Sequence, residues 1–359
     1  MLRFSAIFCA GRRKPLHYVG APLNMKGHGF HLSSETLLTK APGDEPMKIH
    51  CLSGYISTLF LVEYPERRQF LLLDTGAPSD FARIRYFIEN VVGCGYPHSF
   101  PHVAQQPEVS APLKLQESLR LVISTHCHID HLGAGFVYGR EGIPVVTAAR
   151  YQEYYSGWGG RLQEFIDYGL AMVVARRLGR SFESVFIPLN GTLTPAGSRP
   201  LRSLDDNTAV PFFSDWTSIK IPGHTGHMIG TYHAHSQVFY AADLLVASNA
   251  GHRFLPPMPI DIDFAYDHTI HRLRHLPVRY ALLAHGGAVN VDDFGGWNAI
   301  LDEVMRHRSK PPHPKMVFAA KLFSGFSSEP RRFTRDMLPR GPLPPSSPAG
   351  SLPFIAHMK

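Results

Sequence analysis

Short apolar runs recur along the middle of the chain, and each is about as long as one β-strand. Several runs end abruptly in a small or polar cluster, as Phe70–Asp74 does before Thr75 and Gly76. The pattern predicts strands at Lys48–Leu52, Ser57–Glu63, Phe70–Asp74, Leu119–Ser124, Thr217–Ile221, Val238–Ala242 and Tyr280–Ala284.

Helical periodicity appears between some of these runs, around Ser79–Asn90, Gly160–Arg177 and Asp267–Leu276. Strands that alternate with helices predict an α/β domain built of layered sheets. Such sheets carry functional groups on the loops just past the carboxyl ends of their strands. The polar clusters that follow the apolar runs lie at those positions and are therefore candidate sites of binding or catalysis.

Composition narrows the class of protein. The chain has 359 residues, and 44% of them are apolar, which excludes a disordered or fibrous chain. Its four cysteines are too few and too scattered for a disulfide framework. No apolar run approaches the roughly 18 residues that a membrane-spanning helix needs. We therefore expect a folded chain without a membrane span.

Charge is distributed unevenly. Residues 1–45 hold six Lys or Arg and three acidic residues, and residues 306–359 hold ten and two. Because the whole chain has a formal charge of +7, residues 46–305 carry −4. We therefore expect a basic leader at 1–45, a central domain at 46–305 and a basic Pro/Ser-rich tail at 306–359. The acidic body weakens nucleic-acid binding as a reason for the high pI.

The leader has no acidic residue before Glu35 and mixes basic with apolar side chains. Most of its positive charge follows the apolar stretch, which is the reverse of a secretory signal. This order predicts a mitochondrial presequence, with a disordered basic leader on a cytoplasmic protein as the alternative. The tail from about Lys310 is rich in Pro and Ser, so we expect a mobile extension without a helix.

The strongest chemical signal lies within Ser124–Gly133, which holds three histidines and an aspartate within six residues. Neutral imidazole and carboxylate are ligands that Zn²⁺ and similar ions prefer. His126 and His128 lie two residues apart, so on extended backbone they point the same way and can hold one ion. Asp130 and His131 follow where the chain turns into a helix, and there they could face a second ion.

Three further candidate ligands follow predicted strands. They are His224 in Gly223-His224-Thr225, Asp243, and His285 before Gly286. The neighbouring glycines permit sharp turns at two of these positions. Histidine and aspartate side chains, which can bind metals, follow so many predicted strands that a chance occurrence of the His126–His131 pattern is a poor explanation.

The order His-x-His-x-Asp-His, Gly-His-Thr, Asp and His resembles the metallo-β-lactamase superfamily over about residues 46–305. The resemblance implies a four-layer αββα sandwich and a metal-dependent hydrolase. It also implies that Asp74 orients the metal-binding loop without touching the metal.

Carried over by position, the resemblance implies two divalent metal ions bridged by Asp243. Zinc is the favoured metal, with iron or manganese as alternatives. Asp243 together with His285 is similar to the binuclear hydrolases and not to the true lactamases, so a β-lactam is an unexpected substrate. The ligand sets implied are His126, His128 and His224 for one ion, and Asp130, His131 and His285 for the other.

The chain departs from the family pattern in two places. Thr225 runs directly into Gly226 and His227, one residue short of the common loop, so His227 is a candidate contact for a ligand or the substrate. Residues 151–210 form an insertion that begins with an aromatic and helical stretch up to Arg177. It is expected to be a substrate lid, a partner surface or a helix packed on the scaffold.

Two ions that share a hydroxide supply a nucleophile near neutral pH, because metal binding lowers the pKa of water toward about 7. No serine or cysteine nucleophile is then needed, and Cys127 is expected to be a packing residue. Asp130 is expected to manage the nucleophile's proton besides binding metal, a catalytic role that the resemblance implies.

The expected partner is a small-molecule substrate of ester type, a thioester or a lactone. The alternative is an endoribonuclease or another phosphodiester hydrolase, for which the basic tails could hold a phosphate backbone. Persulfide oxidation on a single iron would use only part of this ligand set, and a non-catalytic metal scaffold would not need all of it. No pattern in the sequence indicates an oligomeric state.

Overall fold

A computed structural model describes residues 34–39, 46–93, 112–180, 203–248, 253–311 and 314–344. Three parts of the chain for which predictions were made lie outside the described residues. They are the expected presequence, residues 181–202 of the insertion and the last fifteen residues of the tail. Within the described residues, no helix is long and apolar enough to cross a membrane.

The strands form two six-stranded sheets and one small hairpin. The first sheet has the order β1 (Ser34–Thr39), β2 (Met47–Ser53), β3 (Thr58–Tyr64), β4 (Gln69–Leu73), β5 (Leu119–Ser124), β6 (Val145–Thr147). The second has the order β14 (Gly287–Asn290), β13 (Tyr280–Leu283), β10 (Val238–Tyr240), β9 (Ile229–His233), β8 (Phe213–Lys220), β7 (Thr208–Val210). The hairpin pairs β11 (Val246–Ser248) with β12 (Arg253–Leu255).

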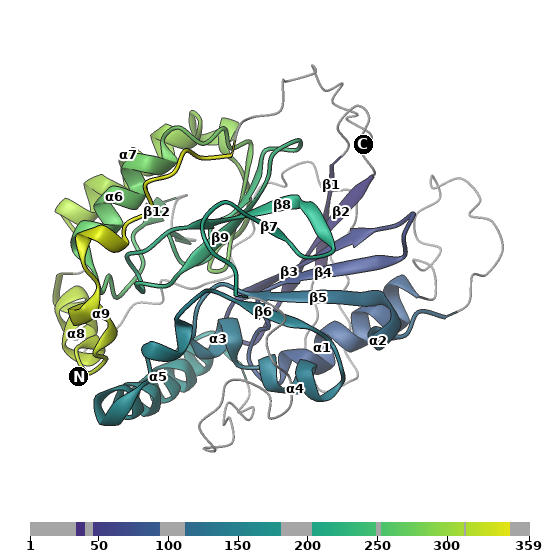
Figure 1. Cartoon of the computed structure of the whole chain (residues 1–359), viewed down its shortest axis with the longest axis horizontal. Coiled ribbons are helices and arrows are strands. Elements are labelled where there is room, and N and C mark those ends of the chain that lie inside the picture. The colour runs from purple at the N-terminus through teal and green to yellow at the C-terminus, as the bar shows by residue number, and fades with distance from the viewer. Residues whose placement is uncertain are drawn as a thin grey trace.

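The helices cover the outer faces of the two sheets, which Figure 1 shows as four layers in the order αββα. Beside the first sheet lie α1 (Asp80–Tyr86) with its continuation η1 (Phe87–Val92), α2 (Leu115–Ser118), α3 (Ile129–Leu132), α4 (Gly135–Arg140), η2 (Tyr151–Glu153) and α5 (Gly157–Arg177). Beside the second lie α6 (Asp263–Leu273), η3 (Val291–Phe294) and α7 (Trp297–Ser309). The chain continues into α8 (Pro314–Ser324), α9 (Glu329–Arg332) and η4 (Arg335–Met337). The predicted α/β sandwich is confirmed.

The alternation of side chains along the strands builds two cores. In β4, Leu71 and Leu73 face the second sheet, whereas Phe70 and Leu72 pack against the helices on the other side. Both faces of the strand are therefore buried, and this is why it appears in the sequence as a continuous apolar run. Because both faces of the strand are covered, functional side chains can contact solvent or a substrate only at the polar ends of the central strands.

All seven predicted strands are present, with ends that differ by a few residues. The expected helix at Gly160–Arg177 is α5, and that at Asp267–Leu276 is α6, which begins and ends a few residues earlier. The expected helix at Ser79–Asn90 divides into α1 and the π-helical η1.

The expectation that the tail is a mobile extension without a helix is wrong for residues 314–337. This segment forms α8, α9 and η4. It also packs on the domain, because Ser327 donates a hydrogen bond to the Tyr154 carbonyl at 2.7 Å and Glu329 is buried against His227. The basic Pro/Ser-rich composition of the tail gave no indication of these helices, which extend to the candidate site.

Candidate metal centre

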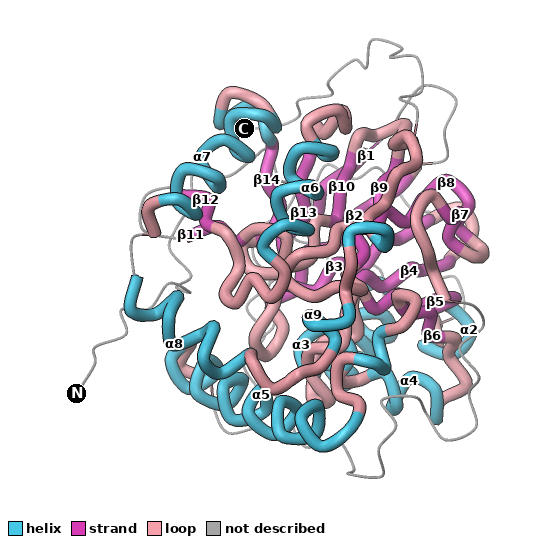
Figure 2. The backbone as a smooth tube through the Cα atoms, turned by 60° about the vertical axis from the view of Figure 1, so that its left-hand side comes forward, coloured by secondary structure: helices cyan, strands magenta, loops and turns pink. Residues whose placement is uncertain are grey.

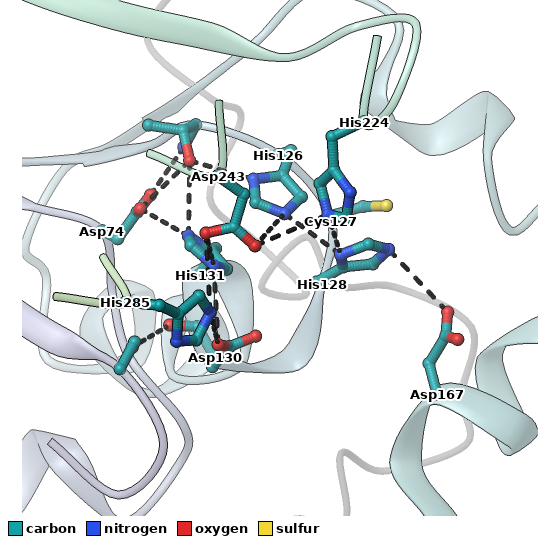
Figure 3. Close-up of polar contacts among 12 residues, drawn as sticks. Asp74, His126, Cys127, His128, Asp130, His131, Asp167, His224, Asp243 and His285 are labelled. Carbon is teal, nitrogen blue, oxygen red and sulfur yellow. Dashed lines mark hydrogen bonds and ion pairs between the residues drawn. The ribbon is translucent and has the colours of Figure 1, made fainter. Parts of the chain in front are cut away.

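The seven candidate ligands converge at the carboxyl ends of strands from both sheets, as Figure 3 shows. Each follows a strand closely, because the strand ends abruptly and the loop turns back over the edge of the sheet. His126 and His128 follow β5, Asp130 and His131 lie on α3, His224 follows β8, Asp243 follows β10 and His285 follows β13. Segments more than 150 residues apart in the chain thus meet in one place.

Three histidines form the first group. The Nδ1 atom of His128 lies 3.1 Å from Nε2 of His126 and 3.0 Å from Nε2 of His224. Burial lowers the pKa of all three imidazoles, and their mutual repulsion lowers the pKa values of His126 and His128 further. These rings are therefore neutral near pH 7, and nitrogen lone pairs are available at a common point.

Asp130, His131 and His285 form the second group. The Oδ2 atom of Asp130 lies 3.3 Å from Nε2 of His285 and 3.5 Å from Nε2 of His131. Asp243 lies between the two groups: its Oδ1 is 3.3 Å from His131 Nε2, and its Oδ2 is 3.5 Å from His224 Nε2. One carboxylate therefore faces both groups with different oxygens.

The second group differs from the first in charge. Burial opposes protonation of His285, but the carboxylates of Asp243 and Asp130 outweigh it and raise the pKa to about 10. The same balance raises the pKa of His131 well above its usual value. In the metal-free protein these imidazoles hold protons that neutralise the carboxylates, so a bound cation would take the place of those protons.

The geometry of both groups fits divalent metal ions. In each group the donor atoms lie within 4.8 Å of one another. Two nitrogen ligands at about 2.0–2.1 Å from a tetrahedral ion lie about 3.3 Å apart, close to the separations seen between these histidines. His131 Nε2 and Asp243 Oδ1 are buried and face each other at 3.3 Å, and neither atom forms a hydrogen bond with a described residue. A cation would satisfy both atoms.

Asp74 contacts candidate ligands of both groups, His131 directly and His126 through Thr125. One of its oxygens accepts a 2.7 Å hydrogen bond from the Thr125 amide, and the other lies 2.6 Å from His131 Nδ1. The Thr125 hydroxyl donates to Asp74 and lies 3.1 Å from His126 Nδ1. Because the Nδ1 atoms of both rings are engaged in this network, their Nε2 atoms face the cluster, as expected of residues behind metal ligands. Tyr240 donates a further hydrogen bond to Asp74.

His227 links two of the ligand-bearing loops. Its Nε2 lies 3.2 Å from the Cys127 amide nitrogen, which donates to it, and its Nδ1 lies 2.9 Å from Glu329 Oε1. His227 therefore does not enter the cluster but holds the loop of His126 and His128 from behind. The Cys127 thiol is buried among aromatic side chains, and burial raises its pKa, which agrees with a packing role.

The insertion brings to the cluster an aspartate, Asp167 on α5, that the sequence did not single out. Asp167 on α5 lies with its Oδ2 4.0 Å from His128 Nε2, and it accepts a hydrogen bond from Tyr155. Tyr154 packs edge-on against the His128 ring and donates to Asp261. Burial raises the pKa of Asp167 to about 7 and that of Asp261 to about 8. No repeating pattern marks these positions, so only the fold reveals them.

An αββα sandwich whose strand ends gather histidines and aspartates into two groups defines a metallo-hydrolase. Comparison with known families agrees: the model of the metallo-beta-lactamase superfamily matches residues 53–285. The chain belongs to this superfamily.

Individual relatives are distant. The chain is 24% identical over 214 residues to a probable metallo-hydrolase, YflN, of Bacillus subtilis, and the match covers 59% of this chain and 69% of YflN. A metallo-beta-lactamase family protein of Thermus thermophilus is similar with a TM-score of 0.47 and 16% identity, covering 82% of this chain and 90% of the other. An archaeal superfamily protein of Sulfolobus tokodaii has a TM-score of 0.43 and 15% identity, covering 77% and 92%.

Proposed function

We propose that this protein is a hydrolase that uses two divalent metal ions, with zinc as the favoured metal, on a small ester-like substrate. The observation that carries the proposal is the division of seven nitrogen and oxygen donors into two groups that share Asp243. His126, His128 and His224 would hold one ion, and Asp130, His131 and His285 the other, while Asp243 would contact both.

Bound ions would supply a nucleophile by lowering the pKa of water, and would polarise the bond to be broken. The chain's own residues have separate tasks. Asp74 and Thr125 hold the rings of His126 and His131 in place. The Oδ2 atom of Asp130 lies within 3.5 Å of the His131 and His285 imidazoles, which outweigh burial and lower its pKa to about 2. Asp130 is therefore ionised and is placed to accept the nucleophile's proton.

The charges around the site favour an uncharged acyl substrate, a thioester or a lactone, over a polyanion. Asp167 borders the His128 side of the cluster, and its pKa of about 7 leaves it partly ionised at neutral pH, so it would repel a phosphodiester. The excess positive charge lies in residues 1–45 and 306–359 instead. Iron or manganese in place of zinc is compatible with the same donors.

One preparation assayed against a thioester, a lactone and a single-stranded RNA, with metal analysis, tests this function. We expect turnover of at least one ester and close to two metal ions per chain, with activity lost on chelation and restored by the metal. RNA cleavage that is strongly salt-sensitive, without any ester turnover, would instead support the phosphodiesterase alternative. A chain that binds no metal would contradict both.

We also propose that the protein is located in mitochondria. Its support is the sequence of the first 20 residues, which mixes Arg and Lys with apolar residues and has no acid.

A further inference from the structure

Helix α5 has an outward face that is apolar. Trp158, Leu162, Phe165 and Val173 are spaced so that they share one side of the helix, and their exposed fractions are 94%, 46%, 71% and 48%. The opposite side of the same helix packs on the domain through buried residues. A contiguous exposed apolar stripe of this kind usually marks an interaction site.

Helix α8 extends this apolar surface. Phe318 and Leu322 on α8 are 72% and 63% exposed, and Phe326 just beyond it is 39% exposed. The Phe326 amide donates to Gln163 of α5 at 3.3 Å, and Figures 1 and 2 both show the two helices side by side. We call the outward faces of α5 and α8, with Phe326, the α5–α8 surface.

The acidic and basic residues of α5, α8 and α9 differ in their exposure to solvent. Their acidic residues, Glu164, Asp167 and Glu329, are buried or half-buried. Some of the cations have local acidic partners, since Arg161 pairs with Glu164 at 2.8 Å, but they remain at the surface. All of their basic residues are exposed: Arg161, Arg176, Arg177, Lys315, Lys321, Arg331 and Arg332. The exposed charged residues of these three helices are therefore all cationic, although Lys321 pairs with Asp263 of α6 at 2.8 Å, and an apolar face with such neighbours complements an anionic surface.

We propose that the α5–α8 surface docks onto a membrane that contains anionic phospholipids. Helices that lie in the membrane interface combine Trp, Phe and Leu on one face with Lys and Arg around them. The apolar side chains would enter the boundary between headgroups and acyl chains, and the cations would contact anionic headgroups. Trp158, which is almost fully exposed, is the natural interfacial anchor.

The docked orientation would bring the candidate metal centre close to the membrane. Asp167, on the inner side of α5, lies 4.0 Å from His128. The centre is therefore about one helix diameter, roughly 10 Å, behind the docking face. The docking itself does not depend on the proposed hydrolytic function.

Co-sedimentation of the full chain with vesicles tests the proposal. We expect binding to vesicles of phosphatidylcholine mixed with phosphatidylserine, weaker binding to phosphatidylcholine alone, and weakening by salt. Trp158→Ser and Phe165→Ser should each lower the affinity for the mixed vesicles about tenfold. Phe212→Ser is the matched control, because Phe212 is 50% exposed but lies at the β7–β8 turn, and it should leave binding unchanged.

Both test residues are exposed, so their variants should keep the circular dichroism and melting temperature of the parent. Absence of vesicle binding, or equal binding by the Phe165→Ser and Phe212→Ser variants, would overturn the proposal. So would a dimer in light scattering that Phe165→Ser dissociates, because a second copy of the chain would then cover the surface.

A second inference rests on a different contact, between the C-terminal segment and the loops of the metal centre. Glu329 is 6% exposed. Its Oε1 is 2.9 Å from His227 Nδ1, and its Oε2 accepts from the Gly226 amide at 3.0 Å. The approach is so close that a Cβ on Gly226 would lie 2.8 Å from Glu329 Oε1.

The contact fixes the tautomer of His227. A carboxylate accepts hydrogen bonds only, so Nδ1 of His227 must donate to Glu329. Nε2 of a neutral ring then carries the lone pair, which accepts from the Cys127 amide. Glu329 therefore connects the loop of His224 to the loop of His126 and His128.

We infer that Glu329 is a positioning residue for the metal centre and acts through His227. The inference rests on the proposed function, since it takes these histidines as metal ligands. Glu329 lies beyond residue 285, where the match to the superfamily ends. The C-terminal segment of this chain thus completes the support of its own metal loops.

Metal affinity, measured by competition with a chelator, tests the inference without an activity assay. Glu329→Ala should weaken metal binding about 10- to 100-fold, and Glu329→Gln less, because the amide oxygen can still accept one of the two hydrogen bonds. Asp336→Asn, an exposed change in the same segment, is the control. If Glu329 acts mainly through His227, Glu329→Ala should have a much smaller effect on metal affinity in a His227→Ala background than in the parent, because only its contact with the Gly226 amide remains to be lost.

The two possible failures can be told apart. A parent chain that binds no metal contradicts the proposed function. A parent chain that binds metal with the same affinity as Glu329→Ala contradicts only the role of Glu329, as do additive effects in the double variant. Melting temperatures of the metal-free proteins separate loss of fold from loss of positioning.

Discussion

Replacing Asp243 with alanine is expected to lower kcat/KM for hydrolysis by about 10³-fold or more and to reduce the metal content. Asp243 faces both groups of candidate ligands, with one oxygen 3.3 Å from His131 Nε2 and the other 3.5 Å from His224 Nε2. No other described side chain has this position between the groups, so the loss of Asp243 should weaken the binding of both ions at once. Steady-state kinetics and metal analysis of the purified variant measure the effect.

His126→Ala should act in the same direction, because it removes one of the three nitrogens of the first group. The matched control is Asp302→Ala. Asp302 lies on α7 with its side chain 59% exposed and pairs with Arg274 at the surface, where an ion pair contributes little. Full turnover by His126→Ala or Asp243→Ala would show that hydrolysis takes place elsewhere in the chain.

The position of the candidate site could be predicted because each ligand lies next to a strand end. Three histidines and an aspartate within His126–His131 form a pattern that a local sequence can carry. His224, Asp243 and His285 have no such local pattern, but each closes an apolar run. Strand ends meet at one edge of a sandwich, so the separate signals point to one place.

Two of the supporting residues, Glu329 and Tyr240, could not be predicted in this way, because their partners are distant in sequence. Glu329 and His227 are separated by 102 residues, and Tyr240 and Asp74 by 166. A single carboxylate in a basic tail, or a tyrosine within a buried strand, looks ordinary in the sequence. Only the packing of the second sheet and of α9 brings these groups to the loops that they hold.

Several described elements were not predicted, and two of them, α8 and β9, were missed for different physical reasons. The Pro/Ser-rich end of the tail dominated its composition and concealed the apolar run that forms α8 (Pro314–Ser324). The strand β9 (Ile229–His233) contains Gly230, a residue type depleted in strands, and it closely follows the loop of His224 and His227, so in the sequence it looks like part of that loop. It is nevertheless a central strand, because it pairs with β8 on one side and β10 on the other, and all five of its residues are buried. Tertiary pairing overrode local propensity there.

Asp74→Asn should cause the second large effect, a loss of about 2–5 kcal/mol in the free energy of unfolding together with weaker metal binding. Asp74 is buried, and its oxygens accept from the Thr125 amide, the Thr125 hydroxyl, His131 and Tyr240. An asparagine has one oxygen and one NH₂ group, so at least one of these donors would face another donor. The backbone should tolerate the change, since Asp74 has a φ of 64° and asparagine adopts that region as readily.

The Asp74→Asn variant thus tests the role of the carboxylate without changing the backbone conformation. With the ring of His131 no longer held by a charged acceptor, we expect metal affinity to fall about 10- to 100-fold. Chemical unfolding of the metal-free protein measures the first effect, and chelator competition measures the second. Asp292→Asn, at an exposed position of η3, should change neither. An Asp74→Asn protein as stable as the parent, with the same metal affinity, would mean that this network does not hold the ligands in place.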